Sequence, residues 1–110
     1  MINDKLLEQI KEQIDEIIES GNGYIKYKDG TLLCYGLDST NTTGYISISF
    51  PITFISIPIV VVQQQSGSET TNIITAKTST IDKSYFRCGC VYAQGYLQQN
   101  INWIAIGKWK

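Results

Sequence analysis

The spacing of the hydrophobic residues changes once along the chain, at Gly23. Before that point, four aliphatic side chains recur at intervals of three and four residues, as at positions a and d of a heptad repeat: Leu7, Ile10, Ile14 and Ile17. This spacing predicts an amphipathic helix over residues 6–20, which the run Ser20-Gly21-Asn22-Gly23 ends. A helix of this length is only marginally stable alone in water, so its apolar stripe needs a partner.

Two partners are open to this apolar stripe. It can pack on the sheet of its own chain, or it can meet the same helix in other copies of the chain. Isoleucine occupies both a and d positions, a choice that favours three or more helices over two. We therefore favour self-association and expect residues 1–21 to form a trimeric coiled coil in a homotrimer.

After Gly23 the hydrophobic period becomes two, which is the period of a β-strand. The run YIKYKDGTLLCYG predicts two strands joined at Asp29-Gly30, a hairpin signal, and Pro51 ends the alternation of ISISF. Further strands are predicted in IVVVQQQ, NIITAKTST, SYFRCGCVYA and INWIAIG, with turns at Ser66-Gly67-Ser68, IDK and QGYLQQN. About six to seven strands result, so the fold class is all-β, and residues 22–110 are predicted to form an antiparallel β-sandwich.

The charge balance argues against two classes of partner. The chain of 110 residues has a net charge of -1 and no cluster of Lys or Arg, whereas binding to nucleic acid needs a basic stripe. For the same reason we expect no membrane partner, and no apolar run reaches the roughly 18 residues of a membrane span. The first residues lack the basic-then-apolar order of a secretory signal, so we expect a chain made in a cytoplasm or cut from something longer.

The three cysteines form an odd set without a secretion signal, which argues against a disulfide framework. Cys88 and Cys90 fall on one face of a predicted strand, too far apart to bridge without distortion. A Cys-x-Cys metal site completed by Cys34 is one interpretation, and small buried hydrophobic side chains are the other. We favour the second, with free thiols and no metal, because the chain has no histidine and no second cysteine pair.

Residues suited to catalysis are scarce. The chain has no histidine, which removes the commonest general base. The carboxylates after the predicted helix all stand beside turn residues, where they serve the backbone: Asp29, Asp38, Glu69 and Asp82. Two of them could meet as a glycosidase pair, but nothing in the sequence supports this, and no Gly-rich nucleotide loop is present. We expect a protein that is not an enzyme and that has no cofactor.

Residues suited to binding are more abundant. Seven tyrosines and two tryptophans can build the aromatic surfaces that, with a few polar groups, recognise saccharides. Tyr85 and Arg87 share the strand face opposite Phe86, so we expect them to point outward. The alternative is a solvated edge in which tyrosine is only a good β-former. Trp103 is expected in the core or at an interface, and Trp109 as an exposed platform or against a neighbouring subunit.

Three motifs, taken in order, resemble the C-terminal domain of phage tail fibre proteins. A hairpin of the form G-x-x-K-x-x-x-G-x-x-x-x-x-G runs from Gly23 to Gly36, F-P-x-x-F occupies residues 50–54, and W-x-A-I-G occupies residues 103–107. Together they cover roughly residues 23–108. The resemblance implies a trimeric β-sandwich similar to the H-type lectins at the tip of a fibre, with the helix as the last piece of the shaft.

The same resemblance implies a function. It suggests a non-enzymatic receptor-binding tip of a virion tail fibre, made in the bacterial cytoplasm and acting outside the cell. Its partners would be two further copies, the remainder of the fibre and a host cell-surface carbohydrate. A structural module that trimerises and caps the fibre without touching a receptor is an alternative, and a free-standing H-type lectin is another.

Residue type supplies the candidate sites. The expected ligand-binding residues are Asp82, Lys83, Tyr85, Arg87, Tyr96 and Trp109, and the expected trimer-interface residues are Leu7, Ile10, Ile14, Ile17 and Trp103. If the strands run along the fibre axis from a helix at the near end, alternate connections lie at the far tip. These would be the Asp29-Gly30 turn, residues 51–58, residues 80–83 and the terminal KWK, while QGYLQQN would lie at the near end.

Overall fold

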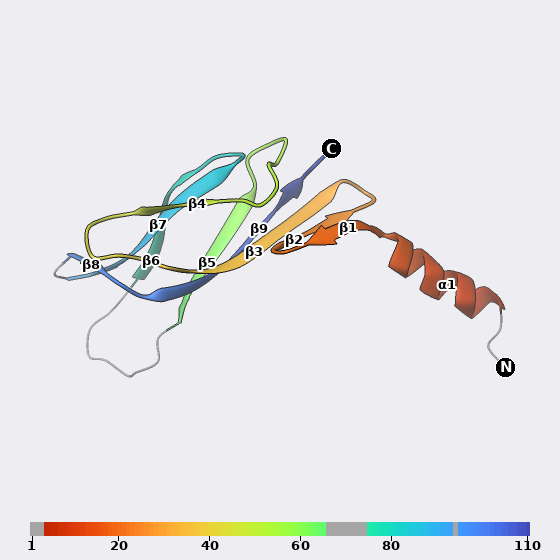
Figure 1. Ribbon diagram of the computed structural model, residues 1–110, viewed down its shortest axis with the longest axis horizontal. Helices are drawn as coiled ribbons and strands as arrows, with labels where there is room; N and C mark the ends of the chain where they lie inside the picture. The colour runs from red at the N-terminus through yellow and green to blue at the C-terminus, as the bar shows by residue number, and fades with distance from the viewer. Residues whose placement is uncertain (1–3, 66–74, 94) are drawn as a thin grey trace.

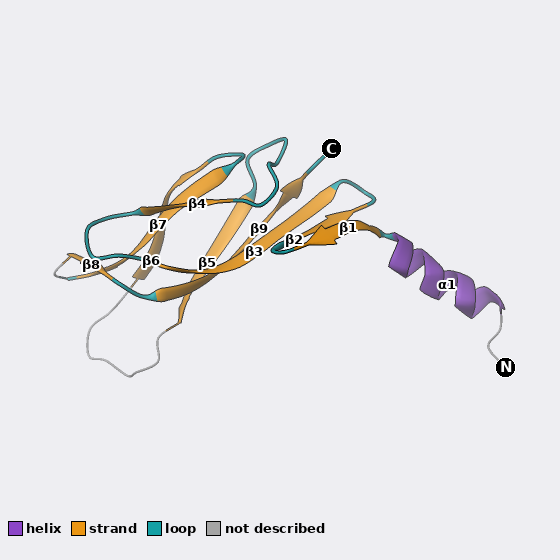
Figure 2. Cartoon of the chain, in the orientation of Figure 1, coloured by secondary structure: helices purple, strands orange, loops and turns teal. Residues whose placement is uncertain are grey.

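A computed structural model of the chain describes residues 4–65, 75–93 and 95–110. The predicted antiparallel β-sandwich is confirmed, with more strands than expected and one helix in the described part (Figures 1 and 2). The elements are α1 (Asp4–Asp15), β1 (Ile17–Gly21), β2 (Tyr24–Tyr27), β3 (Thr31–Ser39), β4 (Ile46–Ser49), β5 (Ile59–Gln65), β6 (Thr75–Ile81), β7 (Tyr85–Tyr92), β8 (Gly95–Leu97) and β9 (Asn100–Lys108). The predicted turn at Ser66-Gly67-Ser68, with Glu69, lies outside the described residues.

The strands form two antiparallel sheets. One has five strands in the order β1-β2-β3-β9-β5, and the other has the order β4-β7-β6 with β8 also paired to β7. Strand β9 holds the larger sheet together because it pairs along its whole length with β3 on one side and, over residues 100–106, with β5 on the other. Its side chains alternate between buried Ile101, Trp103 and Ala105 and more exposed neighbours, which is the period-two pattern of a strand covered on one face.

The helix is shorter than the heptad pattern predicts. It ends at Asp15, and Ile17, expected in the coiled coil, lies on β1 instead. Adjacent β-branched Ile17 and Ile18 favour a strand, and Asn22-Gly23 forms a two-residue hairpin turn to β2, with Gly23 at φ 86°. From the sequence, Asn22 and Gly23 were instead predicted to belong to the segment that ends the helix. Within the described residues, no helix is long and apolar enough to cross a membrane.

This extra hairpin changes which loops lie at which end of the molecule. Strand β1 runs away from the helix and the antiparallel β2 runs back toward it, so the Asp29-Gly30 turn lies next to the helix. There the Lys28 N–H donates to the Glu16 carbonyl oxygen at 2.6 Å. The Trp109 N–H donates to the Gly30 carbonyl oxygen at 2.9 Å, which brings the C-terminus to the same end. The loops expected at the far tip therefore lie toward the helix, and the prediction of their position is wrong (Figure 1).

The described part of QGYLQQN, residues 95–100, lies at the opposite end, away from the helix (Figure 1). It was predicted to be a loop at the near end, yet it contains β8, which pairs with the last residues of β7. The buried Thr40 anchors this end, since its hydroxyl donates to the Leu97 carbonyl oxygen at 2.8 Å and accepts from the Gln99 N–H at 2.9 Å. A short strand and a buried threonine thus order the helix-distal end.

An aromatic cluster fills the space between the sheets. The Phe86 ring lies 5.5 Å from Phe50 and 5.2 Å from Trp103, and Phe50 lies 5.1 Å from Phe54, measured between ring centroids. Trp103 is only 4% exposed in the single chain, so nearly all of its side chain fills the core of its own chain. Of the two roles expected for Trp103, the structure supports the core.

The three cysteines are also part of this core. Cys34, Cys88 and Cys90 are fully buried free thiols, which confirms the interpretation as small buried hydrophobic side chains. Burial raises the pKa of the Cys88 thiol from 9.0 to about 11 and raises the pKa values of the other two as well. Among the described side chains, no three His, Cys, Asp or Glu groups are placed to hold a metal ion.

Candidate ligand-binding face

The outer face of the four-stranded sheet carries the predicted pair of binding residues. On β7, Phe86 is buried whereas Arg87 is exposed and Tyr85 is half-buried, which confirms that these two side chains point away from the core. The register places Ser49 opposite Tyr85 and Ser47 opposite Arg87 on the neighbouring β4. In an antiparallel pair, residues directly opposite point to the same face. Two hydroxyls therefore stand beside the tyrosine and the arginine.

A groove of about 540 Å³ lies at this part of the face. Its walls are Ser47, Ser49, Phe50, Thr53, Ser84, Tyr85 and Arg87. They combine hydroxyl groups, a phenol and a guanidinium with aromatic ring surface, so hydrogen-bond donors and acceptors converge beside an apolar floor. Such a lining suits a ligand that is rich in hydroxyl groups and has an apolar C–H side.

Arg87 links the groove to two further tyrosines. Its Nη2 donates to the carbonyl oxygen of Tyr45 at 3.2 Å, and the Tyr45 ring meets the Tyr96 ring edge-on, with centroids 5.6 Å apart. The Tyr45 ring lies against the backbone of Gly89, where an added Cβ would be 3.2 Å from Tyr45 Cδ1. We call Tyr85, Arg87, Tyr45 and Tyr96 the aromatic strip. It runs from the groove toward the helix-distal end.

Tyr45 was missed as a binding residue by reasoning from the sequence. Tyr45, Ser47 and Ser49 alternate with apolar residues, which indicated that these three share the polar face of β4. Nothing in the sequence placed that face beside Arg87. The partner strand β7 lies some forty residues further along the chain, a separation that only the sheet pairing closes. Tyr96, by contrast, was predicted, and the structure brings it to the same strip through β8.

Asp82 and Lys83 lie beside the groove but not in its wall. They form the tight turn between β6 and β7, in which the Asp82 N–H donates to the Tyr85 carbonyl oxygen at 2.8 Å. The Asp82 carboxylate accepts from the Lys83 N–H at 2.7 Å, and the Phe54 N–H donates to the Lys83 carbonyl oxygen at 2.9 Å. Both residues thus fix the backbone turn that precedes Ser84, a residue of the groove wall. Their own side chains are exposed at the rim of the groove.

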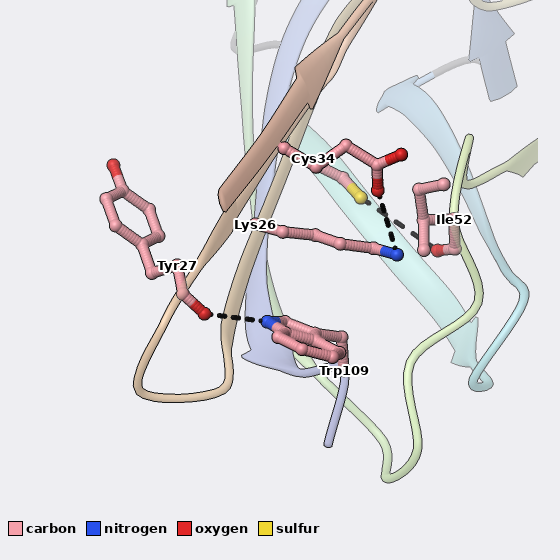
Figure 3. A network of polar contacts seen from close by, with 6 residues as sticks. Lys26, Tyr27, Cys34, Ile52 and Trp109 are labelled. Carbon is pink, nitrogen blue, oxygen red and sulfur yellow. Dashed lines mark hydrogen bonds and ion pairs between the residues drawn. The ribbon is translucent and has the colours of Figure 1, made fainter. Parts of the chain in front are cut away.

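Trp109 lies in a different place from the other predicted ligand residues. Its indole Nε1 donates to the Tyr27 carbonyl oxygen at 2.8 Å on the β2–β3 hairpin (Figure 3). The ammonium groups of Lys26 and Lys110 lie 5.3 and 5.1 Å from the ring centroid, within cation–π distance. The ring is therefore held against its own chain, on the five-stranded sheet, and is not an open platform.

A second hollow, of about 340 Å³, lies at the foot of the helix between Glu16, Tyr27, Lys28 and Asp29. The Asp29 carboxylate accepts from the Thr31 N–H at 2.8 Å, and this hydrogen bond lowers the pKa of Asp29. Asp29 therefore serves the turn, as the sequence predicted. This hollow lies where the helix joins the sandwich, whereas the groove lies on the outer face of the four-stranded sheet.

The architecture defines a two-sheet antiparallel sandwich domain, led by a helix at one end and bearing a polar groove on the outer face of one sheet. The chain belongs to the family described as putative tail fiber protein gp53-like, C-terminal, which matches residues 26–108. The resemblance to tail fibre C-terminal domains is therefore confirmed. No curated protein matches the chain.

Among the solved structures that share the fold, two are pyocin fibres. One is an N-truncated R2-type pyocin tail fibre, and the other is a C-terminal fragment of the R2 pyocin fibre of P. aeruginosa. Each superposes with a TM-score of 0.66 at 18% sequence identity over 77% of this chain. The chain spans only 34% and 23% of the length of those two chains. The likeness establishes the fold of a tail fibre domain.

Proposed function

We propose that this tail fibre domain is the non-enzymatic receptor-binding tip of a phage or phage-derived particle and that it binds a host cell-surface saccharide as a homotrimer. The observation that carries the proposal is the aromatic strip with its adjoining groove. Tyrosine rings pack against the C–H face of a sugar, while serine hydroxyls and a guanidinium bond its hydroxyl groups. The strip and the groove together place these groups on the outer face of one sheet.

The position of the strip fits contact with a receptor. The helix α1 extends from one end of the sandwich, where the remainder of the fibre would join, and β8, the strand that contains Tyr96, lies toward the opposite end (Figure 1). The ligand-binding residues proposed are Tyr45, Tyr85, Arg87 and Tyr96, with Asp82 and Lys83 at the rim. Three such sites on one rigid tip give avidity even when each site is weak. The domain would act outside the cell, on the virion.

The trimer would be held in part by α1. The a and d residues that remain in the helix are Leu7, Ile10 and Ile14, because Ile17 lies on β1. Leu7 is 56% exposed in the single chain, and the side chains of residues 10–15 lie outside the described part. A stripe of this kind, meeting the same helix in two other copies, would align three tips along one axis.

The test is binding of the whole chain to polysaccharides of the host cell wall, measured on a glycan array and by biolayer interferometry. Replacing Arg87 with alanine should weaken binding at least ~10-fold, because one charge-assisted hydrogen bond is lost. Lys28→Ala removes the same charge from an exposed position in the β2–β3 turn, away from the groove, and should bind normally. A wild-type trimer that binds none of these polysaccharides would instead support the structural cap, and equal binding by both variants would exclude this site.

A further inference from the structure

The two sheets differ in what their outer faces expose. Among the described residues, none of the large hydrophobic side chains that are strongly exposed lies on β4, β6, β7 or β8. Half of them lie on β3, β5 and β9 of the five-stranded sheet, on its outer face: Tyr35, Leu37, Ile59, Val61, Ile104 and Ile106. The remainder lie on α1, on β1 and on the loop before β5: Leu6, Leu7, Ile17, Ile18, Ile55 and Ile57. The polar groove and the apolar surface thus belong to different sheets.

The strand register assembles these side chains into one continuous surface. Across β3, β9 and β5, the outward rows are Leu33–Ile106–Ile59, Tyr35–Ile104–Val61 and Leu37–Asn102–Gln63. We call these three rows the apolar face. None of its nine residues is charged, and it becomes polar only at the amides of the third row. Contiguous exposed apolar surface of this kind marks an interaction site more often than a solvated face.

The apolar face is also uneven in a way that suits packing. Ile104 stands between two hollows, one of about 440 Å³ toward Tyr35 and Leu37, and one of about 90 Å³ toward Val61. Ile59 at one margin is 71% exposed and projects from the surface. Ridges and recesses side by side allow side chains of a partner to interdigitate, as they do in protein interiors.

We infer that the apolar face is the main contact between copies of this chain in the homotrimer, an inference that rests on the trimer of the proposed function. The helix is too short for this task alone, since it spans only 12 residues. It leads away from the sandwich along the long axis of the molecule (Figure 1). Neighbouring copies placed around that axis would cover the helix and the apolar face together.

The chemistry of the apolar face also fits identical partners. Rotational symmetry brings equivalent regions of the subunits near one another around the axis, so a charged face would place like charges close together. The uncharged rows avoid this repulsion. On β2, Ile25 is opposite Leu33 of the apolar face, and Tyr27 is opposite the exposed Ile17 of β1, so apolar side chains continue from the sheet toward the helix. The four-stranded sheet then faces outward with its groove free.

The experiment compares two variants of the 110-residue chain, each with one carboxylate added to a different sheet. Ile104→Glu puts it on the apolar face, and Thr75→Glu puts it at an exposed position of β6, on the other sheet. Mass is measured by light scattering and analytical ultracentrifugation over a range of concentrations, with circular dichroism as the check on folding. We expect Ile104→Glu to raise the dissociation constant of the trimer at least ~30-fold, as loss of an interface hot spot does. Thr75→Glu should stay trimeric.

Each other outcome has a defined meaning. A trimeric Ile104→Glu chain would overturn the inference while leaving the homotrimer intact. A monomeric wild-type chain would remove the trimer of the proposed function itself, whereas saccharide binding would still be measured separately. If Ile104→Glu loses its sandwich spectrum, Ile104→Thr keeps the β-branched shape and is compared instead. A raised dissociation constant for Ile104→Thr supports the inference, and an unchanged constant overturns it.

Discussion

The indole Nε1 of Trp103 donates a hydrogen bond to Oδ2 of Asp38 at 2.8 Å, joining the neighbouring strands β9 and β3. Trp103 is almost fully buried, so this bond satisfies a donor that water does not reach. It allows a large aromatic ring with a polar group to sit in the centre of the core. Asp38, which the sequence suggested as a turn residue, therefore has a structural role inside a strand.

Removing this acceptor should lower the free energy of unfolding. Asp38→Ala leaves the indole N–H buried without a partner, and we expect a loss of about 2 kcal/mol. Asp38→Asn keeps a carbonyl oxygen as acceptor and should lose less, about 1 kcal/mol. Urea unfolding followed by tryptophan fluorescence measures both. Identical midpoints for the wild type and both variants would show that the bond does not contribute to stability.

Trp109 should matter for stability and not for ligand binding. Its indole ties the C-terminus to the β2–β3 hairpin through the Tyr27 carbonyl oxygen, and its ring packs against the core. Trp109→Ala loses both contacts and should destabilise the fold by roughly 2 kcal/mol. Trp109→Phe keeps most of the packing and should lose about half as much.

The proposed saccharide site does not include Trp109, so the same two variants should match the wild type in assays of binding to host-wall polysaccharide, under conditions where they are folded. A matched pair at the groove, Tyr85→Ala and Tyr85→Phe, provides the comparison, because Tyr85 lines the groove directly. Biolayer interferometry on the full-length chain measures all four. If Trp109→Ala loses binding while it remains folded and trimeric, Trp109 belongs to the ligand site after all.

The buried thiols should make stability depend on alkaline pH. Burial raises the pKa of Cys88 from 9.0 to about 11, so the thiol stays neutral in the folded chain where the unfolded chain already ionises it. The free energy of unfolding therefore keeps this contribution below pH 9 and loses it as the pH rises through 11. Urea midpoints measured across that range should fall with pH.

Cys88→Ala is the control for this pH dependence. Tyrosines and lysines also titrate at alkaline pH, but they are shared by the wild type and the variant, so the difference between the two slopes reports the thiol. The slope should be shallower for Cys88→Ala. A slope equal to that of the wild type would show that the thiol ionises equally in the folded and unfolded chains. Ellman's reagent should react with the folded wild type slowly and with the unfolded chain quickly.

Local signals in the sequence predicted many elements of the fold. Asp29-Gly30 predicted its hairpin because glycine accepts the positive φ that the turn requires, 98° at Gly30. Alternation predicted that Phe86 is buried and Arg87 is exposed, because successive side chains on a strand point to opposite faces. These features depend on residues close together in the chain, so a short stretch of sequence is sufficient.

The predictions that failed depended on how distant segments pair. Ile17 satisfies both a heptad and a strand pattern, and pairing with Tyr27 on β2 decides in favour of the strand. Because β1 adds one strand before β2, each later turn lies at the opposite end of the sandwich from the one predicted. The Asp29-Gly30 turn therefore lies beside the helix. Tyr45 could not be connected with Tyr96 from the sequence, because their contact depends on β8 folding back onto β7.

The sequence by itself determined the strand-rich fold, the buried cysteines and the outward direction of Tyr85 and Arg87, because each follows from side-chain period and turn chemistry. Only the tertiary structure decided that Arg87, Tyr45 and Tyr96 form one strip and that Trp109 is held against its own hairpin. It also placed the exposed apolar rows on one sheet and the groove on the other. The physical reason is that sheet pairing joins residues far apart in the chain, and no local pattern encodes which strands become neighbours.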